Sequence, residues 1–170
     1  MAHQDFDLKA LYDALDEQRR SREMSWVGVS REINRFVTVA RPIATSTITG
    51  LKTKKLGEGD GILQMLLWLR RTPESFVPGF PEADAERFRL RQLRRGQILR
   101  WDTKALHAAL NAQRQARGMT WSEVAQEIGW FTPGMLTNLA KGGRTGFPPV
   151  MRIVRWLGQP AATYTRVAHW

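Results

Sequence analysis

Apolar side chains alternate with charged ones at helical spacing near the start of the chain and again about 95 residues later. Leu8, Leu11 and Leu15 are three and four positions apart, and Leu106 and Leu110 repeat this spacing. A stripe of apolar residues with this period predicts an amphipathic helix that buries one face. We therefore expect a helix in each of these two stretches.

A second helix is predicted after each of the first two. Ser25 and Thr120 stand where an N-cap is needed, and Thr120 is followed three positions later by Glu123, the pattern of a capping box. Asn34 and Gly129 follow the last apolar residues of these stretches. Both residue types tolerate the left-handed conformation that ends a helix, so a sharp turn is expected at each position.

Third helices are predicted after these turns. Thr132 followed by Pro133 combines an N-cap residue with the residue best suited to the first helical position. In the earlier stretch a longer loop comes first, and the helix is expected to begin near Thr45 or Ser46. Apolar residues in 61–71 and 149–157 predict a fourth helix in each case.

The two sets of helices belong to an internal repeat. Residues 7–36 match 102–131 in a register of 95, and from Ile48 onward the register is 88, so the first copy holds seven additional residues. Trp68 and Trp156 are equivalent in the second register. Self-similarity of this extent predicts two copies of one domain. We expect a first domain at 1–76, a basic connector at 77–100 and a second domain at 101–170.

The order of elements and two sequence stretches resemble a known family. Residues 119–129 and 132–142, with 24–34 and 45–52 in the first copy, resemble the helix-turn-helix region of the Cro and phage-repressor family, also called XRE regulators. The resemblance implies an all-α fold of two tandem bundles, each with four to five helices. It also implies that each third helix enters the major groove of DNA.

The resemblance assigns DNA contacts residue by residue. The positions expected to reach base edges are Thr45, Ser46, Thr47 and Thr49 in the first copy and Gly134, Met135, Thr137 and Asn138 in the second. Asn138 is the most informative of them, because a carboxamide can pair with adenine through two hydrogen bonds. The cations that follow the recognition helices, expected to meet phosphates, are Lys52, Lys54, Lys141 and Arg144.

Charge supports a polyanionic partner. The net charge is +10 and the pI is about 11.0. Residues 1–77 carry 12 basic and 10 acidic side chains, whereas 101–170 carry 8 and 3, so the excess lies toward the second copy and the connector. We expect the connector arginines to contact the DNA backbone, namely Arg89, Arg91, Arg94 and Arg95. Two other interpretations stay open: a solvated linker, or a strut between the domains that buries Phe88 and Leu90.

The tryptophans are interpreted mainly as packing residues. Trp26 and Trp121 open the second helices at equivalent positions, which favours a role in the core over base stacking. Trp130 and Trp170 have no place in the predicted helix faces, so contacts with the other domain or a second subunit are considered for them.

No catalytic or metal site is recognisable in the sequence. Cysteine is absent and the three histidines are far apart, so no metal, cofactor or small-molecule ligand is expected. The acidic residues between 5 and 17 fit the solvated start of a helix, and the glycine-rich run 57–61 lacks the lysine of a phosphate loop and is expected to link two helices. The longest apolar stretch falls well short of the roughly 20 residues that span a bilayer, so a cytoplasmic protein is expected.

The sequence therefore predicts a DNA-binding protein that is not an enzyme. The main hypothesis is a bacterial or mobile-element transcriptional regulator that reads two unlike half-sites of double-stranded DNA. The alternative is a protein-interaction adaptor or antitoxin-like module with weak or partial DNA binding, and a homodimer or a protein partner is possible in either case. RNA binding lacks support, because no aromatic platform on a sheet is apparent.

Overall fold

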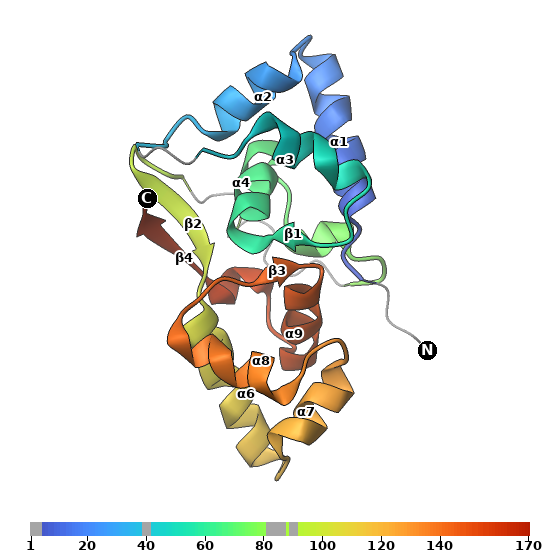
Figure 1. Cartoon of the computed structure of the whole chain (residues 1–170), viewed down its shortest axis with the longest axis vertical. Helices are drawn as coiled ribbons and strands as arrows, with labels where there is room; N and C mark the ends of the chain where they lie inside the picture. The colour runs from blue at the N-terminus through green and yellow to red at the C-terminus, as the bar shows by residue number, and fades with distance from the viewer. Residues whose placement is uncertain (1–4, 39–41, 81–87, 89–91) are drawn as a thin grey trace.

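The computed structural model describes residues 5–38, 42–80, 88 and 92–170. The chain is mostly helical, and its two sequence copies lie end to end along the long axis of the molecule (Figure 1). The elements of the first half are α1 (Leu8–Ser21), α2 (Trp26–Ile33), α3 (Thr45–Thr49), η1 (Gly50–Lys52), β1 (Gly57–Glu58), α4 (Gly59–Leu69) and η2 (Pro73–Phe76). Those of the second half are β2 (Gln97–Trp101), α6 (Thr103–Ala116), α7 (Trp121–Ile128), α8 (Pro133–Asn138), η3 (Leu139–Lys141), β3 (Gly146–Phe147), α9 (Pro149–Leu157), η4 (Ala161–Tyr164) and β4 (Thr165–His169).

Side-chain caps start the helices where the sequence predicts them. The Thr120 hydroxyl accepts a hydrogen bond from the Glu123 amide, and the Glu123 carboxylate accepts one from the Thr120 amide, so the capping box is confirmed. Ser25 caps α2, and Thr132 with Pro133 begins α8. Each such cap typically contributes about 1 kcal/mol to stability.

The ends of α2 and α7 differ from each other. Gly129 has a positive φ of 78°, which glycine adopts readily, but its ψ of 162° is not that of a left-handed helix end. Asn34 has a φ of −87°, so the left-handed conformation expected at the two positions is found at neither. The side chain of Asn34 bonds to the loop instead. Its amide donates to the Ile43 carbonyl at 2.7 Å, and its oxygen accepts from the Ile43 amide at 2.8 Å. Asn34 thereby ties the far end of the longer loop to the end of α2.

The fourth helix of the first half is also shifted from its predicted bounds. The sequence predicts it over 61–71, but α4 begins at Gly59 because the Glu58 carboxylate accepts from the Asp60 and Gly61 amides. It ends at Leu69 because Arg70 takes a left-handed conformation, with a φ of 56°. The run 57–61, expected only to link two helices, therefore forms β1 and the first residues of α4.

The repeat extends to the cores of the two halves. Leu11 and Leu106 are equivalent and fully buried, and so are Val29 and Val124. Even single hydrogen bonds recur: the amide of Asp7 donates to the Phe76 carbonyl at 2.9 Å, just as the equivalent amide of Asp102 donates to Tyr164. Side chains deleted from such cores typically cost about 2 to 5 kcal/mol for leucine to alanine.

Two small antiparallel sheets were not predicted, so the expectation of an all-α fold is wrong in this respect. In the first sheet β1 pairs with β3, and Glu58 lies opposite Gly146. These two residues are equivalent in the register of 88, so the pairing is centred on a local two-fold axis that relates the two halves. Strands of two residues are too short to produce an alternating pattern in the sequence.

The second sheet joins the halves along one side. β2 pairs with β4 from Gln97 opposite His169 to Trp101 opposite Thr165, and this ribbon runs up beside the first half (Figure 1). The residues before it include Phe88, which is 1% exposed, so this side chain is buried as the strut interpretation of the connector expects. Leu90, Arg89 and Arg91 lie outside the described residues.

Side chains of α4 occupy the edge of β2 that β4 leaves open. The Gln64 side chain donates to the Leu99 carbonyl at 2.6 Å and accepts from the Leu99 amide at 3.3 Å. Asp60 accepts from the Trp101 amide at 3.0 Å. A helix of the first half thus satisfies the backbone of a strand that precedes the second half.

Candidate nucleic-acid interface

The short helices α3 and α8 are the elements on which the predicted DNA contacts converge. Both are turned toward the viewer in Figure 1, on either side of the paired strands β1 and β3. Each is held from below by one buried side chain, Ile48 in α3 and Leu136 in α8. The two helices therefore lie on the same face of the molecule.

The second-half residues are open to solvent. Gly134, Met135, Thr137 and Asn138 are all exposed, while Leu136 and Leu139 between them are buried. The Thr137 hydroxyl donates to the Gly134 carbonyl at 3.1 Å. The Asn138 carboxamide has no hydrogen-bond partner among the described residues, so its donors and its acceptor face solvent.

The first-half residues are less accessible. Ser46 is exposed, but Thr45, Thr47 and Thr49 are half-buried. The Thr49 hydroxyl donates to the Thr45 carbonyl at 3.2 Å, one helical turn earlier. The side chains expected to read bases are therefore less exposed on α3 than on α8.

Exposed cations follow both helices. Lys52 and Lys54 come after α3. Lys141 ends η3, directly after α8, and Arg144 lies in the loop before β3. All four are exposed, and none forms a salt bridge among the described residues. Of the connector arginines, Arg94 and Arg95 are exposed, whereas Arg89 and Arg91 lie outside the described residues. The groups able to meet phosphates thus flank both short helices.

The chain matches no protein family model, no curated protein and no solved structure. Among the described residues, no helix is long and apolar enough to cross a bilayer. The same residues contain no cluster of histidine and acidic side chains that could hold a metal ion.

The tryptophans at the start of α2 and α7 are committed to packing. The Trp26 ring stacks on Tyr12 at 5.4 Å and the Trp121 ring on His107 at 5.3 Å. The guanidinium groups of Arg19 and Arg114 lie over these two rings. This supports the packing interpretation, since base stacking would need an open ring face.

An ion pair that occurs in both halves engages two further arginines. Arg117 donates two hydrogen bonds to Glu127, which also accepts from the Trp156 indole. The Arg117 guanidinium and the Trp156 N–H together lower the pKa of Glu127 to about 2. Arg22 and Glu32 form the same pair in the first half, so these arginines are structural.

Trp130 lies at the turn before α8, and the sequence pattern assigns it no helix face. Its side chain is 53% exposed and its φ is 70°. Its ring is nearly perpendicular to that of Phe131, and the two ring centroids are 5.0 Å apart. The equivalent residue of the first half is Arg35, which lies over Phe36 in the same way. The turn therefore presents an aromatic ring in one half and a cation in the other, and the register of the repeat was the signal that could have identified this pair.

Trp170 is bonded to the start of β2. Its indole donates to the Gln97 carbonyl at 2.9 Å, and its amide donates to Gly96. It also borders a cavity lined by residues of the first half. Its hydrogen bonds to the chain before β2 account for its position, and neither interpretation considered for this residue is tested by them.

Proposed function

We propose that this chain binds double-stranded DNA sequence-specifically through α3 and α8, as two tandem helix-turn-helix domains of the Cro and phage-repressor type. Transcriptional regulation in a bacterium or a mobile element is the role that fits such binding. The observation that carries the proposal is the pairing of Glu58 with Gly146, which relates the two short helices by a local two-fold axis and puts them on one face.

Duplex DNA has two-fold symmetry of its own, and dimeric repressors use it. They place two recognition helices in successive major grooves, about 34 Å or one helical turn apart. Two halves related by a two-fold axis within one chain are suited to the same geometry. The exposed cations after α3 and α8 would contact the flanking phosphates.

The two half-sites should differ, because the helices do. Gly134 and Met135 of α8 stand where the first half has Ser46 and Thr47, and Asn138 stands where it has Gly50. Asn138 can read adenine, and Met135 can contact a thymine methyl group. Because its short helix is more exposed and its excess of positive charge is larger, the second half should supply most of the specificity and most of the affinity.

Selection from random duplexes, followed by titration of the selected site at several salt concentrations, tests this proposal. Specific binding should persist at physiological salt on one asymmetric site. The change Asn138→Ala should cost about 1 to 3 kcal/mol on that site and little on unrelated DNA, because it removes one base contact. Gln126→Ala removes an exposed carboxamide from α7 and is the matched control, with no expected loss.

Equal losses on all duplexes would refute base reading by Asn138. Weak binding that salt abolishes on every sequence would refute the proposal as a whole. That result would favour the alternative, in which the same surfaces hold a partner protein.

A further inference from the structure

A cavity of about 740 Å³ lies beside α3, between the first half and the β2–β4 ribbon. Its walls come from α3, from the start of α4, from β2 and from the loop before β3. The volume is in the range of about 300 to 1,000 Å³ that is typical of small-molecule sites. The contributing segments are far apart in the sequence, so no local pattern could have indicated a ligand.

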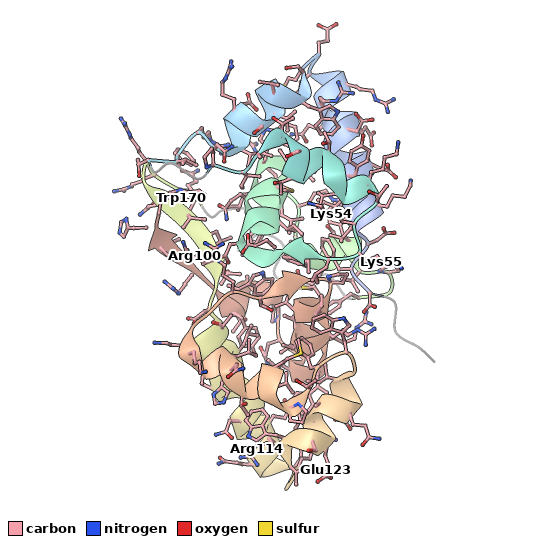
Figure 2. All side chains as sticks on the ribbon, viewed as in Figure 1. Lys54, Lys55, Arg100, Arg114, Glu123 and Trp170 are labelled. Atoms are coloured by element: carbon pink, nitrogen blue, oxygen red, sulfur yellow. The ribbon has the colours of Figure 1, made fainter. Side chains whose placement is uncertain are left out.

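The cavity has an apolar floor and a cationic rim. Ile62, Met65 and Ile98 are buried and form part of the floor. The cationic side chains that line it are Lys54, Arg100 and Arg144. Figure 2 shows Lys54 and Arg100 on either side of α4 in this view. A molecule with an apolar body and a negative group would match both parts.

The acidic side chains at the cavity are already engaged. The Glu58 carboxylate caps α4 by accepting from two backbone amides. One oxygen of Asp60 accepts from the Trp101 amide, and the other lies 4.0 Å from Arg100, at the limit of an ion pair. These carboxylates therefore neutralise the rim only in part.

Arg100 keeps unused hydrogen-bonding capacity. Its Nε is buried and has no hydrogen-bond partner among the described residues. Lys54 and Arg144 form no ion pair among the described residues. The Arg100 side chain is 29% exposed, and its nearest carboxylate oxygen, on Asp60, is 4.0 Å away, so its terminal nitrogens can take a further acceptor from a bound molecule.

We propose that this cavity binds a small organic acid, with its apolar body on the floor and its carboxylate beside Arg100 and Arg144. The acid site itself does not depend on the DNA-binding proposal.

An effect of the acid on DNA binding does rest on that proposal. Lys54 and Arg144 are expected phosphate contacts, and Thr47 of α3 also lines the cavity. A bound acid would compete with phosphate for the same cations and weaken DNA binding, and the effect must be reciprocal.

Calorimetric titration of the full chain with benzoate, octanoate and indole-3-acetate, each beside its neutral amide, tests the site without DNA. At least one acid should bind, and its amide should bind at least about tenfold more weakly, because a charge-assisted hydrogen bond is lost. If no acid binds better than its amide at millimolar concentration, the proposal is overturned.

Two exposed apolar residues provide a matched pair of variants. Leu56 lines the cavity and is 50% exposed, whereas Val27 lies on α2 and is 57% exposed. Leu56→Asp puts a negative charge at the cavity and should weaken acid binding severalfold, while Val27→Asp should leave it unchanged. Equal effects of the two changes would contradict the proposed location. Both residues are exposed, so neither change should unfold the chain.

The coupling is measured with the selected duplex. The acid should lower the affinity for DNA, and saturating DNA should lower the affinity for the acid by the same factor. Acid binding that leaves DNA affinity unchanged would overturn the coupling. If no duplex is bound at all, the calorimetric result in the absence of DNA still decides whether the cavity is an acid site.

Discussion

Positions 59 and 147 are equivalent in the repeat, yet one holds glycine and the other phenylalanine. Phe147 is fully buried at the junction of the two halves, with its ring 4.6 Å from that of Phe6 and 5.5 Å from that of Trp101. Phe6 and Trp101 are themselves equivalent in the register of 95. A single aromatic ring therefore fills the space on the local two-fold axis, and its counterpart must be small.

Substitution of Gly59 tests this packing. A Cβ atom at position 59 would lie 2.4 Å from the Thr145 carbonyl oxygen and 2.9 Å from a ring carbon of Trp101, so Gly59→Ala forces the backbone or the ring to move. We expect a loss of about 1 to 3 kcal/mol in the free energy of unfolding, measured in urea. Gly143→Ala is the control, because a Cβ there meets no atom within 4 Å. Equal stability of the two variants would show that the junction can relax around the added methyl group.

At the scale of elements, β2 depends on a helix that is distant in the sequence. Gln64 of α4 bonds both the carbonyl and the amide of Leu99, and its own side chain is 5% exposed. β2 is thus held on one edge by β4 and on the other by α4. This arrangement turns the end of the predicted connector into part of the scaffold between the halves.

Replacement of Gln64 by leucine keeps the volume but removes both hydrogen bonds to β2. The Leu99 amide and carbonyl would lose their Gln64 partner in a buried environment, at a cost of about 1 to 3 kcal/mol for each group left unpaired. Hydrogen exchange at Leu99 should accelerate, and the urea midpoint should fall. Gln115→Leu, on the exposed side of α6, should change neither quantity. Unchanged exchange in the Gln64 variant would mean that β4 alone holds the strand.

The helices could be predicted from the sequence because their signals are local. Thr120 and Glu123, or Thr132 and Pro133, carry their information within a few residues. The strands could not be, because Glu58 pairs with Gly146 and Gln97 with His169 across long stretches of chain. The exposure of Asn138 followed from the helix period. The half-buried state of Thr47 and Thr49 depends on packing that no local pattern contains.

At the scale of the whole molecule, the two halves contact each other too extensively to behave as independent folding units. Arg152 of α9 forms two hydrogen bonds with Asp5, which precedes α1. The carboxylate of Glu74 accepts from the Ala161 amide, a second link between segments far apart in the chain. With the aromatic junction and the β2–α4 contact, these links connect the two cores.

We therefore expect the chain to unfold in a single transition. The calorimetric and van't Hoff enthalpies should agree, and the unfolding curves followed by helix signal and by tryptophan signal should coincide. Two resolved transitions, or tryptophan and helix curves with different midpoints, would mean that each half folds alone and that the junction contributes little.

The local two-fold axis within one chain also affects how the proposed DNA binding would depend on protein concentration. Separate subunits must first find each other, so their occupancy of an operator falls steeply on dilution. Under the proposed function, α3 and α8 belong to one chain with a shared core, so the two halves need no assembly step before they bind DNA. Occupancy of one site should therefore rise hyperbolically with the concentration of the chain. Each half could also change in sequence while it stays joined to the other.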